Sequence, residues 1–376
     1  MNMDTLTGTP IPAPGYFIRE ELEARGWSQR DLAFILDCPE PAVNVIISGK
    51  RRISPEMAKA LGKVFDVPPE FFANLQNAYD LAQAREPDPG VARRARLQDR
   101  YPVREMLKRG WLQETDAVLL EIQMAKFLEV KTVEEIPHLE HAAKKTVSDD
   151  VPAPQLAWLF RVKQIAKSIS FLAGFSEKKL REALIQLRQL TVDPEEIRHV
   201  PRIMMECGIR YVIVESLPSA KIDGVCFWLD AKSPVIGMSL RFDRIDNFWF
   251  VLRHEIEHVL RGHGRQRATI DTDLDKADAN NSISEEEREA NVEAAVFCIP
   301  QNEMDSFIAR KQPFFSERDV TGFARRLQVH PGIVVGQIQQ RTGRFELLRK
   351  YLVKIRHFAT SGAIVDGWGD VAPVSI

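Results

Sequence analysis

Residues 246–260 read DNFWFVLRHEIEHVL, and this stretch decides the fold of the second half of the chain. His254 and His258 are four residues apart. On a helix such a pair lies on one face, so both imidazoles can reach one ion. Glu255 lies beside the first histidine and can take a proton from an attacking water and pass it to a leaving amine. The apolar spacing predicts an amphipathic helix over 248–261, with Asp246 as its N-cap.

Three short segments before this helix, 210–215, 225–229 and 235–239, are rich in Val, Ile and aromatic residues. Each is bounded by Gly, Pro or Asp, which predicts three strands of a small sheet. A metallopeptidase needs a sheet edge that holds an extended peptide beside its metal ion. The order of strands and helix therefore favours a metal-dependent peptidase.

A zinc hydrolase needs a third protein ligand and one open position. The next predicted helix has an acidic start, in which Glu287 and Asn291 are one turn apart. We expect Glu287 to ligate the ion and Asn291 to orient a ligand imidazole. An acidic first turn is by itself typical of a solvated helix start, because it suits the helix dipole. The alternatives for the third ligand are Glu286, Glu289 and Glu293.

The N-terminal residues 14–85 read as five short helices. The first is predicted over 17–27. The second and third, 29–36 and 40–48, are joined by a tight turn, and Gly49 ends the third. Two short helices at this separation predict a helix-turn-helix, in which the later helix enters the major groove of DNA.

The side chains expected to contact DNA lie on and just after these helices. Asn44 is on the outward face of the third helix, where it can meet a base edge or a phosphate. Glu40, at the start of that helix, is expected to repel phosphate. The candidates for phosphate contacts are Gln29, Lys50, Arg51 and Arg52.

Composition narrows the class of protein. The 376 residues hold 51 Lys and Arg against 53 Asp and Glu, so nucleic-acid contact requires a local basic patch. No apolar run approaches the ~18 residues of a membrane span. The four cysteines form no CxxC pair, which excludes a Cys-type zinc ribbon and indicates reduced thiols. With no secretion signal, we expect a cytoplasmic protein without a membrane partner.

The N-terminal sequence also resembles a known family. The runs GYFIREELEARGWSQRDLAFIL (15–36), GKRRISPEMAKALGKVF (49–65) and PPEFFANLQNAYDLA (68–82) are similar to HigA-like antitoxin repressors of the Xre/Cro helix-turn-helix class. The reading helix departs from the pattern with CPEPAVN (38–44), where such proteins usually place Ser, Thr, Arg or Gln. The resemblance implies a homodimer that binds operator DNA, commonly at its own promoter.

The run DNFWFVLRHEIEHVL, with EREANVEAAVFCIP at 287–300, resembles the ImmA/IrrE family of zinc metallopeptidases. The resemblance implies Zn²⁺ as cofactor. Glu257 stands where that family commonly has Gly or Ala, and its charge is tolerable if it points to solvent. His263 has three interpretations: a further ligand, a transition-state hydrogen-bond donor or a surface residue. By resemblance His254, His258 and Glu287 match the ligands, Glu255 the general base and Asn291 the polar residue one turn on.

We therefore predict a mainly α chain with a small α+β domain. It comprises a helix-turn-helix bundle, a helical middle region, a zincin-like metallopeptidase core with a short sheet, and C-terminal helices. The expected boundaries are 14–85 for the DNA-binding domain, 86–205 for a linker and helical domain, 206–300 for the peptidase core, 301–356 for a C-terminal helical region and 357–376 for a tail.

The two halves together predict an antitoxin-like transcriptional regulator with a zinc-dependent endopeptidase domain. Its protein substrate would be a partner repressor, another regulatory protein or the chain itself. The alternative is a non-proteolytic antitoxin or repressor that binds operator DNA and a toxin, with a structural or inactive metal site. Structural zinc sites usually fill all four positions with Cys or His, so a His-His-Glu set with a separate Glu255 favours the catalytic type.

Overall fold

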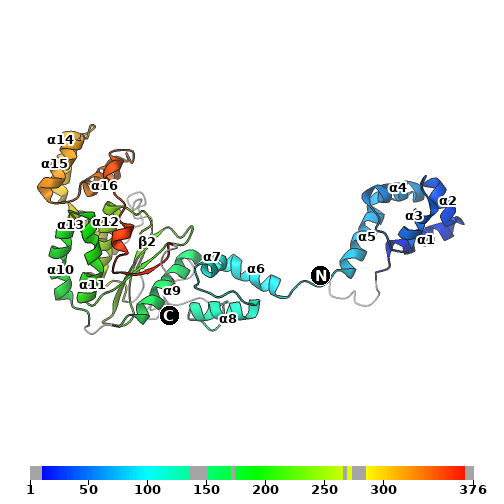
Figure 1. Ribbon diagram of the computed structural model, residues 1–376, viewed down its shortest axis with the longest axis horizontal. Coiled ribbons are helices and arrows are strands. Elements are labelled where there is room, and N and C mark those ends of the chain that lie inside the picture. Colours follow the sequence, from blue (N-terminus) through cyan, green and yellow to red (C-terminus); the bar gives the residue numbers. More distant parts are fainter. Residues whose placement is uncertain (1–10, 136–150, 171–173, 266–268, 273–284, 369–376) are drawn as a thin grey trace. The chain divides into compact units, whose positions relative to one another are not determined.

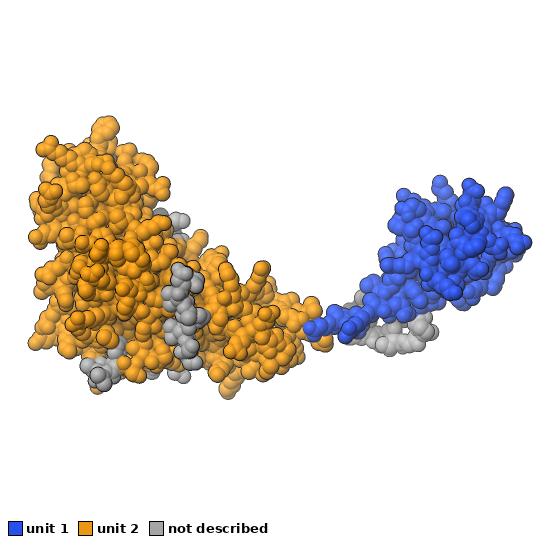
Figure 2. Space-filling model, viewed as in Figure 1, with its two compact units in different colours: residues 1–88 blue, residues 89–376 orange. Residues whose placement is uncertain are grey.

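The computed structural model describes residues 11–135, 151–170, 174–265, 269–272 and 285–368, and it is mainly helical, as predicted. Figure 1 shows the helices and the single sheet, and labels most of the helices and strand β2. The chain forms two compact units, residues 1–88 and 89–376 (Figure 2). Within the described ranges, no helix combines the length and the apolar character that crossing a membrane requires.

The first unit is a bundle of five helices around one apolar core that includes Leu32, Val43 and Phe72. A capping box starts the second helix: the Ser28 hydroxyl accepts from the Asp31 amide, and the Asp31 carboxylate accepts from the Ser28 amide. The helices are α1 (Pro14–Arg25), α2 (Gln29–Ile35), α3 (Glu40–Ile47), α4 (Pro55–Phe65) and α5 (Pro69–Gln83).

The first helix differs from the predicted 17–27. It begins at Pro14, because proline is well suited to a first turn, and it ends at Arg25. Gly26 follows in the left-handed conformation with φ 67°, which glycine adopts at low cost. Trp27 therefore lies beyond the helix and packs against the core of the unit.

The second unit is built on a five-stranded sheet in the order β4-β2-β3-β1-β5. The central strand β3 pairs parallel to β1 and antiparallel to β2, and the edge strands β5 and β4 extend the sheet on either side. Three strands were predicted and are present. The strands are β1 (Arg210–Val214), β2 (Ile222–Trp228), β3 (Pro234–Met238), β4 (Thr269–Thr272) and β5 (Ile364–Asp366).

Helices cover both faces of this sheet, so its strands alternate between two apolar cores. In β2, Val225 and Phe227 belong to the core that includes α9 (Ala153–Ser168), whereas Cys226 and Trp228 belong to the core that includes α12 (Ile245–Arg261). The α12 face holds the residues of the HExxH pattern.

The remaining helices complete the two layers (Figure 1). Those of the first layer are α6 (Gly90–Arg100), α7 (Val103–Lys108) and α8 (Ala117–Phe127). The α12 side has α10 (Glu177–Leu190), η1 (Pro194–His199), α11 (Val200–Glu206), α13 (Glu285–Cys298), α14 (Gln301–Lys311), α15 (Glu317–Leu327), α16 (Pro331–Thr342), η3 (Arg349–Tyr351) and α17 (Arg356–Ala359).

Three local predictions need correction. The sequence also predicts a linker over 86–100, but helix α6 begins within it, at Gly90. The predicted tail contains β5, whose Asp366 is buried against Arg161 and accepts a 3.0 Å hydrogen bond from Trp111 Nε1. Asp246 is not the N-cap of the HExxH helix. Arg244 occupies that position, and Asp246 lies in the first turn, paired with it.

Candidate metal centre and nucleic-acid interface

Three side chains from two helices bring their donor atoms together in the second unit. His254 and His258 lie on α12 and Glu287 in the first turn of α13, and one donor atom of each lies within 4.8 Å of the others. The distance from His254 Nε2 is 3.0 Å to His258 Nε2 and 3.3 Å to Glu287 Oε2, and that from His258 Nε2 to Glu287 Oε1 is 3.6 Å. Both imidazoles are fully buried. The three residues predicted as ligands thus converge.

The spacing of these atoms suits a zinc ion. In a tetrahedral site with bonds of about 2.0–2.1 Å, two ligand atoms are about 3.3 Å apart. The 3.0 Å separation of the two nitrogens, and the 3.3 and 3.6 Å separations from them to the two different oxygens of Glu287, lie around that value. Two nitrogens and one carboxylate oxygen leave the fourth tetrahedral position to another group, as in catalytic zinc sites. The residues present therefore fit the ion that the sequence predicts.

The expected general base, Glu255, is fully buried beside this triad. It lies where α12 packs against β2, and a Cβ at Gly224 of that strand would overlap Glu255 Oε1 and also crowd Val251. Glycine at 224 is thus what allows a carboxylate to fit between helix and sheet. The sequence pattern gave the residue, but the glycine that makes room for it was not predicted.

His263 makes a contact that the sequence did not resolve. Its Nδ1 lies 2.9 Å from His258 Nδ1, on the side of the His258 ring opposite to the Nε2 atom that faces Glu287. A proton on His258 Nδ1, donated to His263, leaves Nε2 with a lone pair for a metal. The Trp228 indole donates to the His263 backbone oxygen at 2.9 Å, which fixes this loop against β2. None of its three interpretations included this contact, and the geometry favours a fourth role, a residue that orients the ligand His258.

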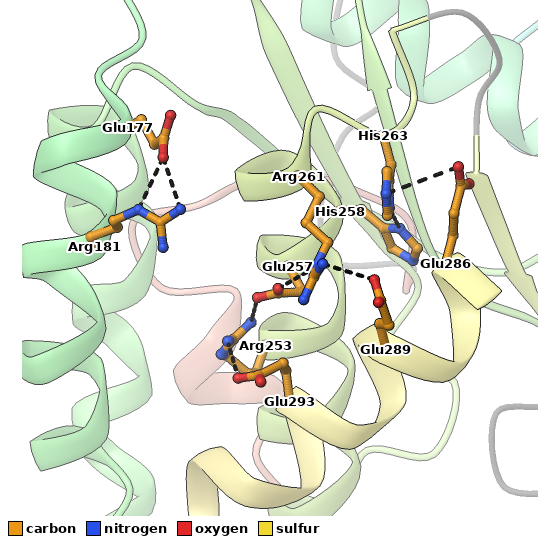
Figure 3. Close-up of polar contacts among 10 residues, drawn as sticks. All are labelled: Glu177, Arg181, Arg253, Glu257, His258, Arg261, His263, Glu286, Glu289 and Glu293. Atoms are coloured by element: carbon orange, nitrogen blue, oxygen red, sulfur yellow. Dashed lines mark hydrogen bonds and ion pairs between the residues drawn. The ribbon is translucent and has the colours of Figure 1, made fainter.

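Glu257 does not point to solvent, the condition under which its charge was considered tolerable, since only 7% of it is exposed. It joins Arg253 at 2.8 Å and Arg261 at 2.7 Å along α12 (Figure 3). Burial raises the pKa of Glu257, but hydrogen bonds to Arg261 and Arg253 and their charges outweigh it, so the pKa is lowered. The carboxylate is thus stabilised by two guanidinium groups.

The same two arginines tie α12 to α13. Arg253 contacts Glu293 at 3.1 Å and Arg261 contacts Glu289 at 2.8 Å (Figure 3). We call these five residues the ion-pair ladder. Two of the alternative third ligands, Glu289 and Glu293, are therefore engaged by the ladder. The third alternative, Glu286, is 61% exposed and lies 3.9 Å from His263 Nε2.

Asn291 follows Glu287 by one turn of α13. Its Oδ1 atom is buried and has no hydrogen-bond partner among the residues that the structure describes. Its role in orienting an imidazole therefore stays a prediction.

The predicted DNA contacts all lie in the first unit. Asn44 is exposed on α3, and Gln29 is the half-buried first residue of α2. Arg30 of α2 forms a 3.2 Å ion pair with Glu40, which offsets the charge expected to repel phosphate. The side chains of Lys50, Arg51 and Arg52 are exposed just after α3.

The loop that carries these basic residues is anchored to α5. The Ile53 amide donates to buried Gln76 Oε1 at 2.9 Å, and Gln76 Nε2 in turn donates to Asp80. Asp80 also pairs with Arg52. The loop that follows α3 is thus fixed to α5 by these contacts.

Comparisons with known proteins agree with this division. The chain matches the family described as "Helix-turn-helix" over residues 18–72, and the M78 peptidase family, described as "IrrE N-terminal-like domain", over 206–337. It is 36% identical over 86 residues to the "Uncharacterized HTH-type transcriptional regulator YddM" of Escherichia coli (strain K12), covering 90% of that protein and 23% of this chain. The chain belongs to the helix-turn-helix family of transcriptional regulators. In its second unit it carries an IrrE-like domain.

Other similar proteins match a comparable share. "Virulence-associated protein A'" of Dichelobacter nodosus is 42% identical over 76 residues, which are 20% of this chain and 66%, just under two thirds, of that protein. An addiction module antidote protein of the HigA family from Coxiella burnetii is 38% identical, covering 20% of this chain and 84% of that one, with TM-score 0.20. Pseudomonas aeruginosa PA4674, solved with its operator DNA, is 39% identical over 20% of this chain and 83% of its own, with TM-score 0.20.

Proposed function

We propose that this regulator is antitoxin-like and that its second unit is a zinc-dependent endopeptidase, which cleaves a partner repressor, another regulatory protein or the chain itself. The observation that carries the proposal is the convergence of His254, His258 and Glu287 from two helices, at separations that suit tetrahedral zinc. The match to the M78 peptidase family over the same segment supports it.

Each residue of the centre would have a distinct part. The two imidazoles and the Glu287 carboxylate would hold the ion, which when bound supplies Lewis acidity toward a peptide carbonyl and toward water. The Glu255 carboxylate would take the proton of the attacking water and deliver it to the leaving nitrogen. Burial of Glu255 against β2 would hold it in one place and exclude bulk water from it.

The first unit would bring this activity to DNA. Asn44 would read the major groove, and the basic loop after α3 together with Gln29 would hold phosphates of an operator. Operators read by such helix-turn-helix proteins have two half-sites, so we propose a homodimer. The match to helix-turn-helix regulators over residues 18–72 supports this part.

The test compares the full chain with its Glu255→Gln variant in the cells that encode it. We expect protein termini that appear only with the wild-type chain, mapped by mass spectrometry of newly formed N-termini. Zinc content near one ion per chain should be equal in both, because Glu255 is not a ligand. If the two strains yield the same termini, the endopeptidase is refuted, and a non-proteolytic repressor or antitoxin that binds a toxin takes its place.

A further inference from the structure

A cavity of about 370 Å³ lies between α12, α13 and α16 in the second unit. Its volume falls in the range of about 300–1,000 Å³ that is usual for sites of small ligands. The metal-site residues His254, His258 and Glu287 are not among its lining residues. The cavity is therefore a separate space that the predicted chemistry does not use.

Two of its walls are shared with the metal centre. Phe250 lines the cavity and stacks on His254, with ring centroids 6.3 Å apart. Asn291 lines it too, one turn after Glu287 on α13. A molecule in the cavity would thus lie one side-chain layer away from the metal ligands.

The charges around the cavity are matched. Its three arginines each have a carboxylate partner. Arg244 pairs with Asp246 at 2.6 Å, Arg288 with Glu285 at 3.2 Å, and Arg341 with Asp305. A charged ligand would have to break the mostly buried Arg244–Asp246 pair or enter without a counter-charge, and both are costly, whereas the Arg288–Glu285 pair is largely exposed and contributes little. The lining thus favours a ligand without formal charge.

Amide and apolar groups make up most of the remaining lining. A carboxamide offers both donors and an acceptor, which is what a peptide group needs. Val292 and Phe345 line the cavity and are 54% and 52% exposed as whole residues, so apolar surface is available to an incoming ligand. The carboxamides are those of Asn247, Asn291, Gln301, Gln337 and Gln340.

From this lining we propose that the cavity binds a peptide segment of the protein substrate, taking an uncharged apolar side chain together with the peptide groups beside it. The proposal rests on the proposed endopeptidase, and it adds that the residue recognised next to the metal centre is apolar. The shared Phe250 wall would couple filling of the cavity to the position of His254. An acidic or basic residue at the same place would be rejected.

Binding can be tested without turnover. The probe is acetyl-Gly-Leu-Gly-amide, with the Asp and Lys analogues for comparison, on zinc-free full-length protein carrying Glu255→Gln, by saturation-transfer NMR. Val292→Trp would block the cavity, and Val296→Trp is the matched control, on the same helix and 40% exposed but outside the lining. Ala295→Trp, one turn further along α13 and also in the lining, is the second blocking variant.

We expect the Leu peptide to bind and both blocking variants to weaken it about tenfold or more, as in other apolar pockets, with little change for Val296→Trp. Equal binding of the Asp or Lys peptide, equal effects of both valine variants, or no binding at all would overturn the inference. A result that refutes the proposed endopeptidase can be distinguished from one that refutes peptide binding in the cavity. A peptide that binds in the cavity but is never cleaved by the zinc-loaded wild type would contradict that proposal alone.

Discussion

The Nδ1 atoms of His258 and His263 lie 2.9 Å apart, so the second imidazole fixes the ring of the first from behind the metal centre. Partners of this kind usually change metal affinity by about 10–100-fold when they are removed. We therefore expect His263→Ala to weaken zinc binding by about that factor, measured by competition with a chelating dye. Glu286→Gln, 3.9 Å from the outer nitrogen of His263 and largely exposed, serves as control. Equal zinc affinity in wild type and His263→Ala would show that His263 has no orienting role.

The ion-pair ladder should contribute to stability in proportion to its burial. Arg253 and Glu257 are four residues apart, and the Arg253 side chain is 6% exposed. Arg181 and Glu177 are also four residues apart, but the Arg181 side chain is 59% exposed (Figure 3). Arg253→Gln leaves Glu257 buried with one partner fewer and should cost about 3 kcal/mol in the free energy of unfolding. Arg181→Gln should cost less than about 1 kcal/mol. Urea unfolding of both variants checks this, and similar losses would contradict it.

Two glycines should respond in opposite directions to alanine. Gly224→Ala places a Cβ on Glu255 Oε1 and must displace the carboxylate or the strand. At Gly322, in α15, nothing lies within 4 Å of an added Cβ. Gly322→Ala should therefore stabilise the protein by about 0.5–1 kcal/mol, whereas Gly224→Ala should lower its melting temperature and abolish any Glu255-dependent cleavage. A Gly224→Ala variant that matches wild type in both would show that the close approach has no consequence.

Acid should weaken the second unit through His330. Burial lowers the pKa of this histidine, with nearby Asp193 opposing, and its Nδ1 accepts from the Gly332 amide at the start of α16. The pKa of His330 is lower in the folded chain than in the unfolded chain, where it is about 6.5. As the pH falls through and below about 6.5, the unfolded chain therefore binds more protons than the folded chain, and the free energy of unfolding falls. His330→Asn keeps a capping acceptor without the titration. Its melting temperature should depend less on pH, and an unchanged dependence would rule out His330 as the cause.

DNA binding should depend on salt through the basic loop. Each phosphate contact contributes a slope of about 0.9 in a plot of log affinity against log salt concentration. Lys50→Ala and Arg51→Ala should each reduce the slope by about that amount on the chain's own promoter. Lys63→Ala, exposed on α4 and outside the predicted interface, should not. If none of these substitutions altered the slope, the phosphate contacts would have to lie elsewhere.

The parts of the fold predicted from the sequence are those with local signals. Ser28 and Asp31 start α2 through contacts three residues apart, and the period of α12 is visible in its own residues. Strand β5 was missed because three residues are too few to show the alternation of apolar and polar residues that marks a strand. Its Asp366 is held by Trp111 and Arg161, which are far away in the sequence.

The candidate site divides in the same way. The pair His254 and His258 is set by helical spacing, and the pattern also pointed to Glu287, which does converge on it. The surroundings were not predictable, because they follow from long-range packing. The partners of Glu257 could not be predicted from its own helix alone, because its partner Arg253 is also contacted by Glu293 from another helix. His263 needed the turn after α12 before its neighbour could be known.

The candidate ligands come from two helices, with 29 positions separating His258 from Glu287 (287 − 258). An ion bound by residues of both helices would crosslink α12 to α13 and close a long loop. Such a crosslink restricts the conformations of the unfolded chain. Chelators would then act on this regulator as mild denaturants as well as inhibitors. Its lifetime in a cell would rise and fall with the supply of zinc, even where nothing is being cut.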